Sequence, residues 1–399
     1  MPTISERGQN LSASPIRKLV PFAEAAKQRG TKVYHLNIGQ PDLPTPQVAL
    51  DAVHNCTLHV VAYSHSAGNL SYRQALTGYY KRLGIQITPE QIIITTGGSE
   101  AIIMAFMTCL NPGDELIIPE PFYANYRSFA QQAQVKVVPV RSDIDHDFAL
   151  PPVAEFERLI TPRTKGIMIG NPNNPTGYLY KKEELEQLAT IIKKHDLYVF
   201  SDEVYREFCY DGEKHTSMMS LNSIADNVIL IDSVSKRYSM CGVRIGALIT
   251  RNQEVYNTAM KYAQARLSPP SFGQIAAEAA VSTPESYFHD MYNEYIARRN
   301  YMVGRLNNMP GVYSPMPKGA FYTVVRLPID DSDRFAKWLL EDFSYNGATV
   351  MVAPATGFYA TPGLGKNEVR MAYVLKLEDL QAAMDTLEVA LKQYPGRTN

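Results

Sequence analysis

Short apolar runs alternate with amphipathic segments from about residue 90 to residue 250 of this chain. The runs have the length and β-rich composition of strands, whereas segments such as Lys181–His195 have a helical pattern. The strand candidates are Gln91–Thr95, Glu115–Ile118, Val135–Pro139, Lys165–Ile169, Leu197–Ser201, Val228–Ile231 and Arg244–Ile249. This alternation predicts an α/β lobe in which helices cover a mostly parallel seven-stranded sheet.

The composition indicates a globular protein with a large core. The 399 residues are too many for one ordinary domain, so we expect two lobes. The net charge of −1 gives no electrostatic attraction for nucleic acid or an anionic membrane, and no apolar stretch has membrane-spanning length. The start Met1–Arg7 lacks an apolar signal core, and the four cysteines show neither a disulfide pattern nor metal-like pairs. We therefore expect a cytoplasmic protein without a metal site.

A second, smaller α+β lobe is expected after about residue 284. Helices are predicted at Glu285–Met309, Ser332–Phe343 and Leu377–Gln393, and strands at Ala320–Arg326 and Val369–Val374. The proline-rich segment up to Pro46 is expected to pack on this lobe as an arm. We predict a large domain over residues 47–284 and a discontinuous small domain from residues 1–46 and 285–399.

Polar residues follow several of the predicted strands, and ligands of open parallel sheets bind outside the strands' carboxyl ends. Gly98 and Ser99 open a predicted helix (Ala101–Cys109), where free amides suit a phosphate, although a serine-capped turn needs no ligand. The run Gly170–Gly177 contains three asparagines, and it is either a rigid amide-bearing loop or an ordinary turn. Asp202 ends another strand, where it suits either a ring nitrogen or a helix N-cap.

Lys236 lies in the run Asp232-Ser233-Val234-Ser235-Lys236, directly after the strand candidate Val228–Ile231. A lysine amine suits covalent chemistry with a carbonyl group, whereas most lysines are solvated surface charges. Arg244, between two glycines, is a natural phosphate contact. An amine for an aldehyde and a guanidinium for a phosphate together indicate pyridoxal 5′-phosphate (PLP) as the cofactor.

Over nearly its whole length the chain resembles the class I/II aminotransferases of PLP fold type I. The motifs that carry the resemblance are Asn171-Pro172-x-Asn174-Pro175-Thr176-Gly177, Asp202-x-x-Tyr205, Ser233-x-Ser235-Lys236, Gly242-x-Arg244-x-Gly246 and Arg370 in Glu368-Val369-Arg370-Met371. The segments Asn37–Asp42, Tyr63–Gly68 and Pro119–Tyr123 fit the same family.

The resemblance implies a role for each of these residues. Lys236 would carry PLP as an internal aldimine and then shuttle the substrate's Cα proton. Asp202 would pair with the ring nitrogen, Tyr205 and Asn174 would bind the ring oxygen, and Tyr123 would stack on the ring. The implied phosphate contacts are Gly98, Ser99, Ser233, Ser235, Arg244 and, from the partner subunit of a homodimer, Tyr63. Arg370, with Asn174 and the amide of Gly39, would bind the substrate carboxylate.

The family resemblance implies exchange of an amino group between an amino acid, with aspartate or an aromatic amino acid favoured, and a 2-oxo acid. Ser99 stands where some dicarboxylate-specific relatives carry a lysine, which Arg17, Lys18 or Arg266 could replace. A carbon–sulfur β-lyase on the same scaffold is the alternative, because the cofactor pocket alone does not choose which substrate bond breaks. A PLP-binding sensor module is a further possibility, but such modules usually carry a DNA-binding segment, and this chain shows none.

Overall fold

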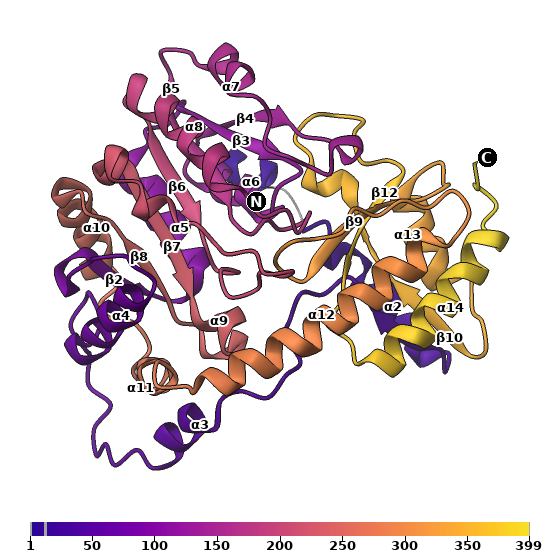
Figure 1. Ribbon diagram of the computed structural model, residues 1–399, viewed down its shortest axis with the longest axis horizontal. Helices are drawn as coiled ribbons and strands as arrows, with labels where there is room; N and C mark the ends of the chain where they lie inside the picture. The colour runs from indigo at the N-terminus through magenta and orange to yellow at the C-terminus, as the bar shows by residue number, and fades with distance from the viewer. Residues whose placement is uncertain (1, 12–13, 399) are drawn as a thin grey trace.

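The computed structural model describes residues 2–11 and 14–398 (Figure 1). Within these residues the strands form one sheet of seven, one of three and one of two strands. The seven-stranded sheet and its helices make up one part of the molecule, and the two small sheets with their helices make up the other (Figure 1). The long helix α12 (Glu285–Asn307) runs between the two parts.

The seven-stranded sheet has the order β2-β8-β7-β6-β5-β3-β4. Its strands are β2 (Ile92–Thr95), β3 (Glu115–Glu120), β4 (Lys136–Arg141), β5 (Thr164–Gly170), β6 (Tyr198–Asp202), β7 (Val228–Ser233) and β8 (Gly246–Ile249). β8 is antiparallel to both β2 and β7, and the other neighbours are parallel. The prediction of a mostly parallel seven-stranded α/β sheet is therefore confirmed.

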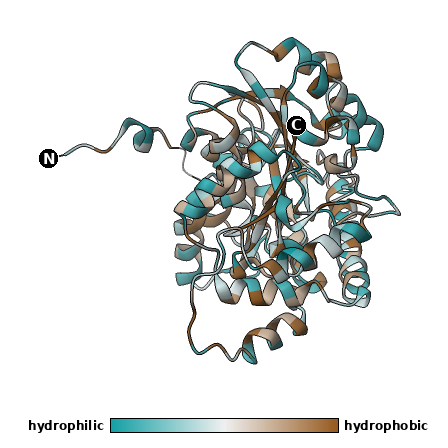
Figure 2. Ribbon diagram, turned by 90° about the vertical axis from the view of Figure 1, so that its left-hand side faces the viewer, coloured by the Kyte–Doolittle hydropathy of each residue, from teal (hydrophilic) through white to brown (hydrophobic). Residues whose placement is uncertain are grey.

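Apolar residues of the sheet alternate between two separate cores, which is why its strands read as continuous hydrophobic runs. Ile92 and Ile94 face the core shared with α4 (Leu70–Arg82), α8 (Lys182–Lys194) and α11 (Ser271–Ala280), whereas Ile93 faces the core shared with α5, α6 and α10. The remaining helices of this part are α3 (Gln47–His54), α5 (Gly97–Cys109), α6 (Asn125–Gln132), α7 (Val153–Leu159), α9 (Val234–Arg237) and α10 (Gln253–Ala265). Hydropathy colouring shows the apolar strands inside this helical cover (Figure 2).

The smaller part is built from both ends of the chain. Its strands are β1 (Lys32–His35), β9 (Tyr322–Arg326), β10 (Ala348–Met351), β11 (Ala353–Pro354) and β12 (Glu368–Ala372), and its helices are α2 (Val20–Gln28), α13 (Ser332–Glu341) and α14 (Leu377–Gln393). β1 pairs in parallel with β10, which joins the segment before Pro46 to the C-terminal residues. The domain limits at residues 47 and 284 stay a prediction. The short helix α1 (Glu6–Asn10) projects away from the body (Figure 2).

Several element boundaries differ from the predicted ones for a local reason. The predicted strands Arg244–Ile249 and Ala320–Arg326 begin two residues later, because Arg244 (φ 57°) and Ala320 (φ 56°) have left-handed backbone that cannot continue a strand. The helix predicted from Ala101 already begins at Gly97. The strands β1, β10 and β11 were not predicted. Among the described residues, no helix combines the length and the apolarity needed to cross a membrane.

Candidate active site

A cavity of about 1050 Å³ opens at the carboxyl edge of the large sheet, where it also meets the N-terminal segment and the smaller part. Its walls bring together the predicted residues Gly39, Gly98, Ser99, Tyr123, Asn174, Asp202, Tyr205, Ser233, Ser235, Lys236, Arg244 and Arg370. Most of them follow β2, β3, β5, β6 or β7, because parallel strands end at the same edge, whereas Gly39 follows β1 and Arg370 lies on β12. The predicted residue Tyr63 is absent from this lining, and its side chain is 79% exposed.

Lys236 lies on the short helix α9, whose first turn Ser233 caps by accepting a hydrogen bond from the amide of Ser235 (3.1 Å). The Lys236 Nζ donates to the carbonyl oxygen of Gly39 at 2.7 Å and lies about 6 Å from the ring of Tyr205. Cys241 Sγ is 3.8 Å from the same nitrogen. The amine is therefore half-buried between the sheet edge and the N-terminal segment.

Asp202 ends β6 as a buried carboxylate that lines the cavity, and no basic side chain of the described residues forms an ion pair with it. Burial raises the pKa of Asp202 to about 6, although a hydrogen bond from the Tyr126 hydroxyl (2.7 Å) opposes the shift. The amide of Val204 donates to the other carboxylate oxygen at 3.3 Å. A cationic group in the cavity would lower this pKa and use the free acceptor capacity of the carboxylate.

The first turn of α5 and Arg244 form one corner of the cavity. The opening amides of a helix lack intrahelical partners, and no side chain caps those of α5. A Cβ on Gly97 (φ 76°) would lie 2.4 Å from Nη2 of Arg244, so glycine is required for this approach. Helix amides, the Ser99 hydroxyl and a guanidinium together suit a phosphate group.

Arg370 comes from β12 and is only 2% exposed. Its Nη1 donates to Oδ1 of Asn174 (3.0 Å) and its Nη2 to the carbonyl of Asn37 (2.6 Å), while its Nε has no hydrogen-bond partner. No carboxylate of the described residues forms an ion pair with Arg370, and burial lowers its pKa. A buried guanidinium that faces a cavity without a counter-ion is suited to bind a ligand carboxylate.

In the loop Gly170–Gly177, two asparagine side chains hold the loop itself and the third lines the cavity. Asn171 donates to the carbonyl of Thr216 (3.1 Å) and accepts from the amide of Tyr180 (3.1 Å), and Asn173 accepts from the Thr176 hydroxyl (2.9 Å). Asn174 lines the cavity. The loop is therefore held by its first two asparagines, so that the third is available to a ligand.

Of the three cations predicted as substitutes near Ser99, Arg17 alone lines the cavity. Lys18 pairs with Asp333 at 2.5 Å, and Arg266 pairs with Glu100 at 3.1 Å. Within the described residues no carboxylate pairs with the exposed Arg17. Arg17 is thus the cation of this group that remains available to a substrate.

Two tyrosines of the cavity were missed in the sequence. Tyr126 follows Tyr123 by about one helical turn, a spacing that could have indicated a shared face. Tyr322 comes from β9, and its hydroxyl lies 2.9 Å from that of Tyr205. Nothing in the sequence around Tyr322 indicates this contact, because it joins residues from the two parts of the molecule.

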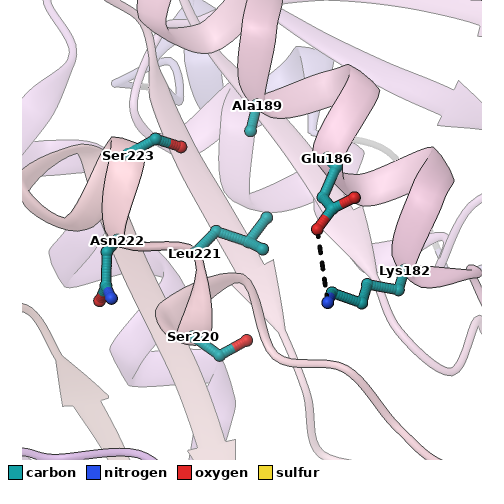
Figure 3. A pocket seen from close by; sticks show the side chains of 7 residues that line it. All are labelled: Lys182, Glu186, Ala189, Ser220, Leu221, Asn222 and Ser223. Atoms are coloured by element: carbon teal, nitrogen blue, oxygen red, sulfur yellow. Dashed lines mark ion pairs between the residues drawn. The ribbon is translucent and has the colours of Figure 1, made fainter.

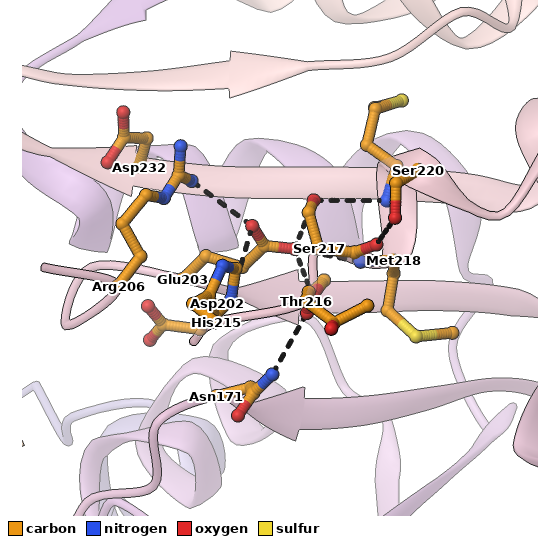
Figure 4. A network of polar contacts seen from close by, with 12 residues as sticks. Asn171, Asp202, Glu203, Arg206, His215, Thr216, Ser217, Met218, Ser220 and Asp232 are labelled. Atoms are coloured by element: carbon orange, nitrogen blue, oxygen red, sulfur yellow. Dashed lines mark hydrogen bonds and ion pairs between the residues drawn. The ribbon is translucent and has the colours of Figure 1, made fainter. Parts of the chain in front are cut away.

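Another polar group, here called the ion cluster, lies behind the cavity and consists of Glu203, Arg206, Glu207, Asp232 and Arg237. Arg237 contacts Asp232 (2.6 Å) and Glu207 (3.0 Å), and Arg206 contacts Glu203 (3.2 Å). Figure 4 shows Glu203 between Arg206 and Ser217, whose hydroxyl donates to it at 2.8 Å. The cluster fixes the residues on either side of Lys236.

A second cavity of about 440 Å³ lies beside α8, and its lining shares no residue with the large cavity. Figure 3 shows its walls, which contain the ion pair between Lys182 and Glu186 (3.6 Å) and none of the predicted site residues. Because both charged side chains are more than half exposed, solvent screens their charges, and this ion pair is a weak basis for a ligand site.

Comparison with known proteins agrees with the fold and with the cavity residues. A sequence model of the family "Aminotransferase class I and II" matches residues 31–387. The chain is 36% identical to an aspartate aminotransferase of Pyrococcus horikoshii over 98% of this chain and 97% of that protein. It is 34% identical to aromatic-amino-acid aminotransferase 2 of Thermococcus litoralis over 98% of both. The solved structure of Thermus thermophilus aspartate aminotransferase with maleate superposes with a TM-score of 0.89 at 30% identity, covering 98% of this chain and 100% of that one. The chain therefore belongs to the class I and II aminotransferase family.

Proposed function

We propose that this aminotransferase holds PLP in the large cavity and transfers an amino group between an L-amino acid and a 2-oxo acid. The observation that carries the proposal is a pair of buried ionic groups that face one cavity and form no ion pair within the described residues. Asp202 lacks a cation and Arg370 lacks a carboxylate, so the cavity has complementary places for a basic ring and for an acid. The family resemblance and the lysine between these two groups support the same proposal.

The cavity residues fit PLP by the chemistry of their donors and acceptors. Gly98, Ser99, Ser233, Ser235 and Arg244 would hold the phosphate, and Asp202 would keep the ring nitrogen protonated. Asn174 and Tyr205 would donate to the ring oxygen, and Tyr123 offers an aromatic face. When bound, PLP supplies an electron sink for the pair of electrons released at the substrate Cα.

Lys236 has two tasks in this proposal. Its Nζ would hold the cofactor at rest and, once freed by the substrate amine, would take the proton from the substrate Cα. The Gly39 carbonyl, 2.7 Å from Nζ, holds the amine toward the cavity rather than toward solvent. The ion cluster holds Arg237, the last residue of the short helix α9, so that the amine starts from a fixed position.

Arg370 is proposed to bind the substrate α-carboxylate, since its Nε–H has no acceptor among the described residues and can donate to a ligand oxygen. We infer aspartate or an aromatic amino acid as the donor. Arg17 suits the distal carboxylate of aspartate, and the walls formed by Tyr123, Tyr322 and Ile102 suit an aromatic side chain. The names of the aspartate and aromatic-amino-acid aminotransferases that it resembles support these two classes.

We propose a homodimer that completes the site with Tyr63 of the partner subunit. Tyr63 lies in the segment between α3 and α4, which forms a loop at the lower edge of Figure 1. Apolar side chains are exposed along this segment, α3 and the neighbouring α11: Val48, Leu50, Val53, Leu58, Val60, Val61, Leu70 and Phe272. A face of this kind is typical of a protein interface. Sedimentation at several concentrations tests it, with Tyr63→Phe expected to weaken cofactor binding.

A half-reaction screen tests the proposed function. Purified protein loaded with PLP is mixed with single amino acids, and conversion to the pyridoxamine form is followed by absorbance. We expect conversion with aspartate or an aromatic amino acid, and loss of the covalent colour in Lys236→Ala. Release of pyruvate and ammonia instead would indicate the β-lyase, and a colourless wild type that PLP cannot restore would contradict the proposal.

A further inference from the structure

Tyr322 lies at a junction of three groups that the proposed function uses. Its hydroxyl is 2.9 Å from the hydroxyl of Tyr205 and 3.4 Å from the carbonyl of Gly39, which also accepts from Lys236. The guanidinium carbon of Arg370 lies 4.5 Å from the centre of its ring. The side chain is 2% exposed and lines the cavity. Tyr322 thus contacts both the ring-oxygen side and the carboxylate side of the site.

The close approach to Gly39 shows how tightly this hydroxyl is placed. A Cβ on Gly39 would lie 1.6 Å from the Tyr322 hydroxyl oxygen, so any side chain there would displace the phenol. The ring also contacts Phe321 (4.8 Å between centres) and meets Tyr205 edge-on at 5.6 Å. The phenol therefore has little freedom to move away from Tyr205.

The number of available protons determines which phenol donates in the hydrogen bond between Tyr322 and Tyr205. Each phenol has a single proton to donate. If Tyr205 donates its proton to the ring oxygen of the cofactor, the 2.9 Å contact is a hydrogen bond only when Tyr322 donates to Tyr205 in place of the more distant Gly39 carbonyl (3.4 Å), which already accepts from Lys236. A hydroxyl group that accepts a hydrogen bond becomes a stronger donor in the hydrogen bond that it makes itself. Donation by the Tyr322 hydroxyl would therefore make the Tyr205 hydroxyl the better donor.

The ring of Tyr322 has a second task toward Arg370. No carboxylate neutralises this guanidinium, and its Nε has no partner, so the aromatic face is one of its few favourable electrostatic contacts. The ring of Phe358 lies 4.9 Å from the guanidinium carbon as well. These aromatic contacts hold the cation in place without occupying its hydrogen-bond donors, so the N–H groups that Asn174 and Asn37 do not use are left for a substrate.

We propose that Tyr322 is a positioning residue that acts on both sides of the site: its hydroxyl strengthens Tyr205 as a donor, and its ring orients Arg370. The inference rests on the proposed function. The two tasks belong to different atoms of one side chain, so they can be separated. Tyr322→Phe removes the hydroxyl and keeps the face, and Tyr322→Leu removes both.

The test combines absorbance titration of the PLP-loaded enzyme with steady-state kinetics for the amino donor found in the half-reaction screen. A donor to the ring oxygen lowers the pH at which the lysine-bound colour titrates. Tyr322→Phe should therefore raise that midpoint by about half a pH unit, a threefold change, with KM within about twofold of wild type. Tyr322→Leu should show the same rise together with a KM increase of about threefold to tenfold.

Tyr313→Phe is the matched control, because its hydroxyl donates to Asp147 (2.7 Å) away from the cavity, and neither value should change. Thermal melting of each variant shows that the fold is kept. A Tyr322→Phe midpoint equal to wild type would overturn the hydroxyl's task, and equal KM values for Phe and Leu would overturn the ring's task. A wild type that binds no PLP would instead refute the proposed function itself.

Discussion

Asp202 is the last residue of β6 and Asp232 the last but one of the neighbouring strand β7, and both side chains are buried, yet their carboxyl groups differ in acidity. Burial raises the pKa of Asp202 to about 6. Burial acts on Asp232 in the same direction, but Arg237 and Arg206 outweigh it and lower its pKa to about 2. Both carboxyl groups are buried near the same edge of the sheet, so the difference comes mainly from the cations that lie beside Asp232.

The same contrast separates the two buried arginines. Arg237, 1% exposed, contacts Asp232 and Glu207 and lies over the ring of Tyr79 at 4.2 Å. Arg370 has amide and carbonyl acceptors but no carboxylate. A charge that the chain itself neutralises holds the structure, and a charge that it leaves open to a cavity is available to a ligand.

The largest expected effect is on folding, from removal of a cation of the ion cluster. Arg237→Met leaves Asp232 and Glu207 buried without their partner, so we expect a loss of about 3–5 kcal/mol in the free energy of unfolding. Urea denaturation measures it. Arg334→Met is the control, since its pair with Asp330 is exposed and should contribute less than about 1 kcal/mol. Equal losses in the free energy of unfolding would contradict the proposed difference between the buried ion cluster and an exposed ion pair.

Arg370→Met should weaken substrate binding and leave stability nearly unchanged, which is the opposite of the effect expected for Arg237→Met. No carboxylate loses its partner, so the free energy of unfolding should change by less than about 1 kcal/mol. The KM for the amino donor should rise about a hundredfold, because the substrate carboxylate loses a charge-assisted pair of hydrogen bonds. Steady-state kinetics and PLP titration measure the two. A PLP affinity that falls as much as the substrate affinity would count against a role confined to the carboxylate.

These arginines and aspartates show how far the sequence could predict the site. The order of strands and the residues after them place Asp202, Asn174 and Lys236 at one edge, because parallel strands end together. The sequence could not separate Asp202 from Asp232 by environment, since both follow apolar strands. Their difference depends on Arg237, Arg206 and Tyr80, and Tyr80 reaches Asp232 (2.7 Å) from α4. Tyr322 was missed for the same reason: its contacts form between distant elements.

The raised pKa of Asp202 predicts that the PLP-free protein loses stability as pH rises. A carboxyl group whose folded pKa (about 6) exceeds its ordinary value (3.8) stabilises the fold below that ordinary value and loses this contribution as pH rises through 6. Between pH 5 and pH 8 the loss is about 1 kcal/mol. Asp232 does not contribute in this window, because its lowered pKa places its titration below pH 4.

Urea denaturation of PLP-free wild type and Asp202→Asn at pH 5 and pH 8 measures this difference. The wild type should lose about 1 kcal/mol more than Asp202→Asn, since the amide does not titrate. Loading with PLP should abolish the excess loss, because a ring cation beside Asp202 favours its charged form. The same pH dependence in both PLP-free proteins would contradict the raised pKa of Asp202, and with it the proposed difference from Asp232.

The smallest expected effect comes from the exposed pair beside α8, which extends the contrast to charges that water already solvates. Lys182→Ala removes an ion pair of 3.6 Å whose partners are 63% and 53% exposed, so the free energy of unfolding should change by at most about 0.5 kcal/mol. Neither KM nor PLP affinity should change. Urea denaturation and kinetics in low and high salt check both statements. A change in KM in Lys182→Ala would mean that the second cavity is coupled to the large one. The exposure of a charged side chain would then not distinguish the charges that act on ligands from those that do not.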